Sequence, residues 1–186
     1  MRILICYDGS ADAQAAIQST GHLMPGSDAT VLVVWETLLE SLTRTGALGL
    51  GLGLVADYAD DDTDAALRTD ALDTATDGAQ RAAEAGLRAE SRIAKRDDDM
   101  TKVILDAASD VDADVIVLGT RGRSGIKSLM LGSVSSAVVH HADRPVLVIP
   151  SPALVQERQK LADHIESIPG APPHRSEKEQ HERSIN

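Results

Sequence analysis

A glycine-rich segment between an apolar run and a helical pattern constrains the fold of this chain most strongly. Residues 115–118 are Val-Ile-Val-Leu, typical of a buried strand, and residues 134–141 have the spacing of a helix. Between them, residues 119–133 read Gly-Thr-Arg-Gly-Arg-Ser-Gly-Ile-Lys-Ser-Leu-Met-Leu-Gly-Ser. Proteins of the α/β class hold phosphate groups in such loops, because glycines let backbone N–H groups approach an anion and the following helix points its first N–H groups at it.

The charge distribution also indicates an anionic ligand at this segment. The chain has 29 acidic and 18 basic residues and a formal net charge of −11, yet residues 115–142 contain no Asp or Glu. Arg121, Arg123 and Lys127 lie within that window. A cationic island in an anionic protein favours a small anionic ligand, whereas the overall charge disfavours nucleic acid or an anionic membrane surface as the main partner.

The order of apolar runs and helical patterns predicts the fold class. Strands are predicted for residues 2–7, 30–35, 87–94, 115–118 and 146–149. Helices are predicted for residues 11–23, for 63–85, for a segment that follows 97–99 and runs through 111, and for 134–141. Strands that alternate with helices predict a single-domain α/β fold with a doubly wound, five-stranded parallel sheet.

Individual residues refine these elements. Ser10 is placed to cap the first helix, and Gly86 is placed to end the second. The apolar face of the second helix is predicted from the helical spacing of Leu72, Ala75, Ala79 and Ala82. Residues 87–94 alternate apolar and polar side chains, which favours a strand near an edge of the sheet. Asp8 and Gly119 follow predicted strands, so we expect them to be neighbours where the strand order reverses, the usual ligand site of such sheets.

Two regions fall outside the repeating pattern. Residues 36–62 form a long connection that contains a leucine- and glycine-rich run at 46–55 and is expected to be a flexible insert. The run at 46–55 is interpreted as a mobile surface loop, or else as a lid or a segment that binds a protein partner. Residues 151–186 are expected to be a tail, with a short helix followed by disorder. The predicted domain therefore covers residues 1–150.

The single cysteine and the hydropathy pattern bear on location. Cys6 is the only cysteine, so no intrachain disulfide can form, and it lies in an apolar run where a buried, inert thiol is expected. No signal peptide is visible, and no apolar stretch reaches the roughly 18 residues that a membrane span requires. A cytoplasmic location is the simplest interpretation.

The glycine-rich segment has the spacing Gly-x2-Gly-x9-Gly-[Ser/Thr], which resembles the nucleotide-binding signature of the universal stress protein family, in its ATP-binding branch. The resemblance extends through residues 131–135 (Leu-Gly-Ser-Val-Ser) and 142–148 (Ala-Asp-Arg-Pro-Val-Leu-Val). It also includes the opening Ile-Leu-Ile-Cys-Tyr-Asp-Gly-Ser of residues 3–10. It covers about residues 1–150, with 36–62 as a poorly matched insert. The resemblance implies a Rossmann-like fold similar to that of the adenine nucleotide alpha hydrolases.

The resemblance also implies roles for individual residues. Asp8 would contact the adenosine moiety, although a carboxylate here can also complete the turn into the first helix. Val34 would contribute an apolar backbone position beside adenine. Gly119 and Gly122 would let the backbone wrap around the ribose and phosphates. Arg123 would neutralise charge, or would simply be solvated.

The start of the helix after the glycine-rich segment is the implied site for the outer phosphates. Gly132, Ser133, Val134 and Ser135 occupy this position, where the helix end carries roughly half a positive charge. The chain departs from the family after the third strand, where many members have Gly-Asp-Pro or similar. Here residues 96–100 read Arg-Asp-Asp-Asp-Met, which puts in doubt how this loop closes over the ribose.

The resemblance implies a cytoplasmic ATP-binding regulator of the stress response, with little or no turnover. Mg²⁺ or Mn²⁺ would accompany the triphosphate, and no residues are assigned to catalysis or to a metal. Slow hydrolysis or autophosphorylation at Ser133 or Ser135 stays open. Residues 146–149 would pair across a homodimer.

Two alternative functions also stay open. One is an ATP-dependent adenylating or pyrophosphatase-like enzyme, although residues 8–12 (Asp-Gly-Ser-Ala-Asp) lack the Ser-Gly-Gly-x-Asp-Ser loop of those proteins. The other is an interaction module with structurally bound ATP, whose run at 46–55 would engage a partner. A Gly-x4-Gly-Lys-[Ser/Thr] loop is absent from the sequence, which argues against a P-loop ATPase.

Overall fold

The computed structural model describes residues 1–46, 61–96, 99–120 and 131–166. Within these residues the elements follow in the order β1 (Arg2–Cys6), α1 (Ala11–Leu23), β2 (Asp28–Trp35), α2 (Leu38–Arg44), α3 (Asp61–Glu84), β3 (Arg88–Lys95), α4 (Met100–Asp110), β4 (Val115–Gly119), α5 (Ser133–His141), β5 (Val146–Ile149) and α6 (Pro152–Glu166). The chain divides into two compact units, Met1–Ser151 and Pro152–Asn186, and only α6 is described in the second.

The first unit contains a five-stranded sheet with the order β3-β2-β1-β4-β5, and every paired strand is parallel. β1 lies in the middle, with Ile3 opposite Ala29 of β2 on one side and opposite Val115 of β4 on the other. The predicted α/β fold with a doubly wound parallel sheet is therefore confirmed. The strand predicted near an edge, β3, is an edge strand.

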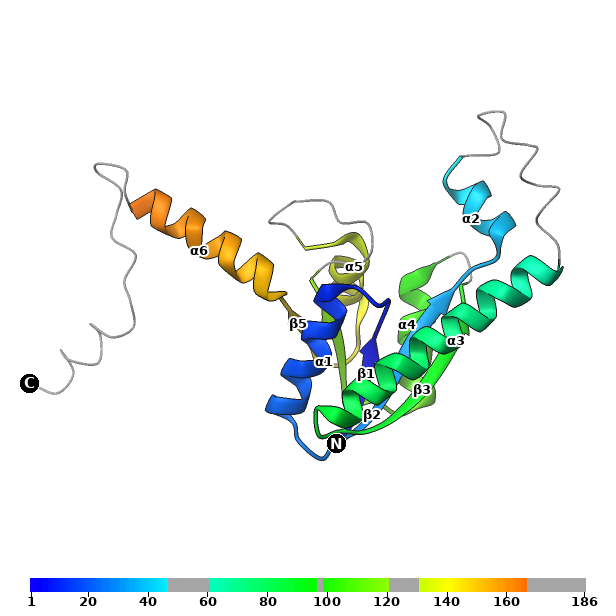
Figure 1. Ribbon diagram of the computed structural model, residues 1–186, viewed down its shortest axis with the longest axis horizontal. Coiled ribbons are helices and arrows are strands. Elements are labelled where there is room, and N and C mark those ends of the chain that lie inside the picture. Colours follow the sequence, from blue (N-terminus) through cyan, green and yellow to red (C-terminus); the bar gives the residue numbers. More distant parts are fainter. Residues whose placement is uncertain (47–60, 97–98, 121–130, 167–186) are drawn as a thin grey trace, which may run out of the picture. The chain divides into compact units, whose positions relative to one another are not determined.

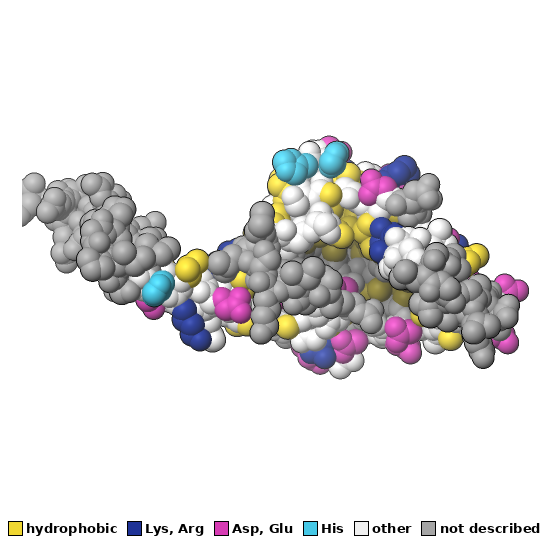
Figure 2. All heavy atoms as spheres, turned by 90° about the horizontal axis from the view of Figure 1, so that it is seen from above, with side chains coloured by type: hydrophobic (Ala, Val, Ile, Leu, Met, Phe, Trp, Pro, Cys, Tyr) yellow, Lys and Arg dark blue, Asp and Glu magenta, His cyan; other side chains and the backbone are white. Residues whose placement is uncertain are grey.

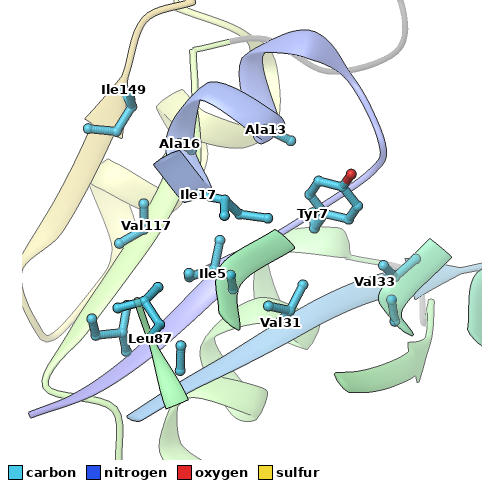
Figure 3. Packing of buried hydrophobic residues seen from close by; sticks show 14 of the residues in the cluster. Ile5, Tyr7, Ala13, Ala16, Ile17, Val31, Val33, Leu87, Val117 and Ile149 are labelled. Carbon is cyan, nitrogen blue, oxygen red and sulfur yellow. The ribbon is translucent and has the colours of Figure 1, made fainter. Parts of the chain in front are cut away.

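Two layers of helices cover the sheet (Figure 1). α1 and α3 lie over one face, where their buried residues pack against strand residues such as Ile5, Val31 and Val117. Figure 3 shows this packing, with Ile17 of α1 and Tyr7 at the end of β1 among the labelled side chains. α4 and α5 cover the other face around a cluster of mainly aliphatic residues: Leu4, Leu32, Ile104, Ala107, Ala108, Ala113, Ile116, Leu118 and Val138.

The helix boundaries agree closely with the sequence. The Ser10 side chain caps α1 by accepting a hydrogen bond from the Ala13 N–H at 3.2 Å, as predicted. Gly86, placed to end α3, has a φ of +92° just beyond the helix. Asp99 caps α4 by accepting from the Thr101 N–H at 2.8 Å.

The predicted apolar face of α3 is wrong at Leu72. This side chain is 45% exposed, whereas the buried residues of the helix are Ala71, Ala75, Gly78 and Ala82. The reason is the closeness of the packing. A Cβ on Gly78 would come within 2.7 Å of Tyr7 Cδ1, so only small residues fit on the face toward the sheet.

The connection at residues 36–62 contains a helix that sequence analysis missed. α2 begins after Thr37, whose hydroxyl accepts from the Glu40 N–H at 3.3 Å while the Glu40 carboxylate accepts from the Thr37 N–H at 2.9 Å. This reciprocal pair is a capping box, and the spacing Thr37-x-x-Glu40 is its sequence signature. Residues 47–60, with most of the leucine- and glycine-rich run, lie outside the described residues, as does the end of the tail after residues 169–173, where disorder is predicted.

Candidate functional site

The strand order reverses between β1 and β4, and this determines where a ligand site is expected. The chain passes from β1 to β2 and β3 on one side, and β4 and β5 lie on the other. The carboxyl ends of β1 and β4 are adjacent, because Ile5 is paired with Val117. Figure 2 looks from above onto this end of the sheet, where hydrophobic side chains show near the centre of the view. In sheets of this order, ligands bind at such a reversal.

Asp8 lies in the turn that follows β1. It is half-buried, and its Oδ1 accepts a hydrogen bond from the Ser10 N–H at 3.0 Å. The next residue, Gly9, has a φ of +79°, a conformation that glycine adopts without steric cost. The structure therefore gives Asp8 the turn-forming role that its position in the sequence allowed. Its contact with a ligand stays a prediction.

Gly119 ends β4 against the first turn of α1. A Cβ at this position would lie 2.8 Å from the Asp12 carbonyl carbon, 2.9 Å from Asp12 Cβ and 3.0 Å from the Asp12 carbonyl oxygen. These atoms belong mostly to the helix backbone, which cannot rotate away as a side chain can. Gly119 is thus required for close strand–helix packing, in addition to any role beside a ligand.

Thr120 was not identified from the sequence, yet it connects three segments at this edge. Its N–H donates to the Ile149 carbonyl at 3.0 Å, its hydroxyl lies 2.9 Å from Asp12 Oδ2, and its carbonyl accepts from the Gly132 N–H at 2.8 Å. The side chain is 4% exposed. Its sequence signal is slight, since a hydroxyl residue after an apolar strand is common.

The N-terminus of α5 lies at the same edge, where the Gly132 N–H donates to the Thr120 carbonyl just beyond β4. Gly132 is its N-cap residue, and among the described residues no side chain caps the helix there. The first turn contains no acidic residue, and Ser133 and Val134 are exposed. A helix end of this kind carries unsatisfied N–H donors and a partial positive charge, which together favour an anion.

Ser135 differs from its neighbours in the first turn of α5. Its hydroxyl donates to the Gly119 carbonyl at 2.8 Å, and the residue is 5% exposed. The hydroxyl therefore joins α5 to the end of β4. Any contact of Ser135 with an anion would come from its backbone N–H.

Of the remaining predicted site residues, Val34 is described by the structure and two others are not. Val34 lies near the carboxyl end of β2 and packs, half-buried, against the cluster that includes Val138 of α5. It is therefore on the sheet face that α5 covers. Gly122 and Arg123 lie outside the described residues, as do Arg121 and Lys127.

Arg144, in the run that resembles the family's C-terminal half, has a structural role. Its Nη1 donates to the Ala108 carbonyl at 2.9 Å and to the Ala113 carbonyl at 3.0 Å. The Ala108 carbonyl lies in the last turn of α4, where a cation is favourable to the helix dipole, and Ala113 lies in the turn between α4 and β4. The guanidinium group therefore joins the chain before β5 to the C-terminus of α4.

Three observations bear on other kinds of function. Burial, with a smaller contribution from the Asp8 charge, raises the pKa of the Cys6 thiol to about 12, so this thiol stays protonated at neutral pH. Over the described ranges there is no group of three or more His, Cys, Asp and Glu side chains placed to hold a metal ion. Nor does any described helix have both the length and the apolar content that crossing a bilayer would demand.

The strand order and its reversal between β1 and β4 place this chain among the doubly wound α/β proteins, a class in which ligand sites lie beyond the carboxyl ends of the strands. More specifically, the chain belongs to the universal stress protein family, whose model matches residues 1–150.

Individual relatives agree with this assignment. Universal stress protein YxiE of Bacillus subtilis is 29% identical over 148 residues, which cover 80% of this chain and 97% of that protein. The universal stress protein from Archaeoglobus fulgidus has a similar structure, with a TM-score of 0.58 and 24% identity over 80% of this chain and 98% of that one. A family protein from Arabidopsis thaliana with AMP bound has a TM-score of 0.52 and 18% identity, over 82% of this chain and 93% of that one. At 24% and 18% sequence identity, the similarity to these two solved structures establishes the fold of this chain.

Proposed function

We propose that this protein binds ATP at the carboxyl edge of the sheet and acts as a nucleotide-responsive regulator of the stress response, with little or no turnover. The observation that carries this proposal is the N-terminus of α5, whose N-cap residue Gly132 has no side chain to cap the helix and which adjoins the ends of β1 and β4. The Arabidopsis relative with AMP bound supports an adenine nucleotide as the ligand class.

The outer phosphates would bind at the first turn of α5. The backbone N–H groups of residues 133–135 are the donors expected there, and the exposed Ser133 hydroxyl is a further one. Gly132 has a φ of −62° and a ψ of 156°, which any residue can adopt. Its value in the site is therefore the absence of a side chain between the backbone and the anion.

The nucleoside would lie toward β1 and β2. Asp8 would accept a hydrogen bond from the ribose or adenine, and the backbone at Val34 would border the base. Gly119, Gly122 and Arg123 would contact the ribose and phosphates. Mg²⁺ or Mn²⁺ would be carried mainly by the triphosphate.

The difference in exposure between Ser133 and Ser135 predicts which hydroxyl would accept a phosphoryl group in an autophosphorylation reaction. Ser133 is exposed, whereas the Ser135 hydroxyl is buried and bonded to the Gly119 carbonyl. We therefore expect Ser133 to be the acceptor. Phosphopeptide mapping after incubation with Mg·ATP tests this, and phosphate on Ser135 alone would contradict it.

The proposed protein is a cytoplasmic homodimer that pairs through β5. β5 is an edge strand with half-buried Val146, Leu147 and Val148, which suits pairing with a second copy in a homodimer. A purified protein that sediments as a monomer at micromolar concentration would contradict that assembly. A cytoplasmic location and a protein partner of residues 46–55 are also proposed, and pull-downs with and without that segment test the partner.

The first experiment is mass spectrometry of the nucleotide released from the purified protein, compared with a Gly132→Val variant. We expect ATP from the parent and none from the folded variant. Ala66→Val is the control for an added valine side chain, because Ala66 is exposed on α3, a helix that contributes no residue to the proposed site. Titration of nucleotide-free protein with Mg·ATP and with AMP then measures the preference for the triphosphate. Absence of nucleotide in the parent, together with no binding of added Mg·ATP, would refute the proposed function.

A further inference from the structure

We propose that Asp12 is a positioning residue of the nucleotide site, which acts through Thr120 on the N-terminus of α5. This inference rests on the proposed binding of ATP at that helix end. It assigns a role to a residue of α1 that has no expected contact with the ligand.

The first step is the hydrogen bond between Thr120 and Asp12. The Thr120 hydroxyl lies 2.9 Å from Asp12 Oδ2 and 3.3 Å from the Ile149 carbonyl. A hydroxyl has one proton, and a carboxylate is the stronger acceptor. The Ile149 carbonyl already accepts the Thr120 N–H at 3.0 Å. Asp12 is therefore the main acceptor for the hydroxyl proton.

The second step leads from Thr120 to α5. The Thr120 carbonyl accepts the N–H of Gly132 at 2.8 Å, and the Gly132 carbonyl accepts the N–H of Ser136 at 2.9 Å as α5 begins. The hydrogen bond between Thr120 and Gly132 thus joins the two ends of the glycine-rich segment, residues 119–133. A shift of Thr120 would move Gly132 and change the direction of the first N–H groups of α5.

The third step is the location of Asp12 itself. It lies in the first turn of α1, whose backbone is packed against Gly119. A carboxylate is favourable at a helix N-terminus, so Asp12 is held by α1 rather than by the ligand. Its negative charge would repel a phosphate at close range. The residue therefore acts by orienting Thr120 and not by direct contact.

The test compares the ATP dissociation constants of five variants by calorimetry at a temperature where each is folded. Asp12→Ala and Thr120→Val each remove the hydrogen bond, and we expect each to weaken ATP binding about tenfold, the effect of losing a bond to a charged group. Asp12→Asn and Thr120→Ser keep an acceptor and a hydroxyl, and we expect both to bind within about twofold of the parent. The double variant should be no weaker than either single one, because both act through one bond.

Thr20→Val is the matched control for a general loss of stability. Thr20 is fully buried near the C-terminal end of α1, whereas Asp12 lies in its first turn, and the Thr20 hydroxyl donates to the Ala16 carbonyl at 2.7 Å. We expect this variant to lose stability and keep its ATP affinity. If Asp12→Ala does not fold, Thr120→Val and its serine counterpart still decide the question.

The outcomes separate this inference from the proposed function. A parent that binds no ATP refutes both. A parent that binds ATP, with Asp12→Ala and Thr120→Val binding equally well, overturns the positioning role alone. Additive losses in the double variant would also overturn it, because they would show that the two residues act separately.

Discussion

Replacement of Gly119 by alanine tests the packing of β4 against α1. The added Cβ would lie 2.8 Å from the Asp12 carbonyl carbon and 2.9 Å from Asp12 Cβ, with the carbonyl oxygen at 3.0 Å. Ordinary contacts are longer, so the first turn of α1 would have to move away from the sheet. Overpacking of this kind costs about 1–3 kcal/mol, and the upper part of that range applies because helix backbone must shift.

Alanine has less conformational freedom than glycine in the unfolded chain, and this offsets part of the cost, by roughly 0.5–1 kcal/mol. We therefore expect Gly119→Ala to lower the free energy of unfolding by a net amount of about 2 kcal/mol. For a chain of this size that corresponds to a decrease in Tm of about 4–8 °C. Urea unfolding followed by circular dichroism measures the first quantity, and calorimetry measures the second.

Gly78→Ala is the comparison for this variant. Its Cβ would meet side-chain atoms, Tyr7 Cδ1 at 2.7 Å and Val31 Cγ1 at 2.8 Å, which can adjust more easily than backbone. Alanine also has a higher helix propensity than glycine by about 1 kcal/mol, so we expect a smaller loss here. A Gly119→Ala protein as stable as the parent, or more stable than Gly78→Ala, would refute the packing argument.

Three further predictions concern single side chains. Because burial raises the pKa of Cys6 to about 12, iodoacetamide at pH 8 should alkylate the native protein far more slowly than the protein in urea, and equal rates would contradict this. The Thr37 N–H, followed by Lys95, lowers the pKa of Glu40 from 4.5 to about 2, so its stabilisation of α2 should be complete above pH 4.5 and be lost as the pH falls toward 2. An NMR titration with a Glu40 midpoint at 4.5 would contradict that. Ser135→Ala should lower the free energy of unfolding by about 1–2 kcal/mol through loss of its buried hydrogen bond, and Ser133→Ala by less than about 0.5 kcal/mol, both measured by urea unfolding. The opposite order would be inconsistent with the structure.

The sequence predicted the sheet well because four of its strands contain short apolar runs and the fifth, β3, alternates apolar and polar residues. Residues 146–149 were predicted to be a strand, and β5 has those bounds. The N-caps at Ser10 and Asp99 were predictable because capping depends on a few adjacent residues. The capping box at Thr37 was also present in the sequence, but the surrounding long connection concealed the short helix that it begins.

The apolar face of α3 shows where periodicity alone was insufficient. A large apolar residue such as Leu72 suggests a core position, but the distance between α3 and the sheet admits only small side chains. That distance depends on Tyr7 and Val31, which are remote in sequence. Thr120 was missed for a similar reason, because its importance comes from Asp12, Gly132 and Ile149.

The sequence by itself determined the fold class, the approximate order of elements and the family, because these depend on local periodicity and on a motif that is contiguous in the chain. Tertiary structure decided which atoms meet at the carboxyl edge of β1 and β4. It assigned Gly119 to packing against α1, the Ser135 hydroxyl to the Gly119 carbonyl, and Thr120 to the connection between α1 and α5. The contacts of Gly119 and Thr120 with Asp12 join residues more than 100 positions apart, so no local pattern specifies them, and they arise only when the strands and helices are packed together.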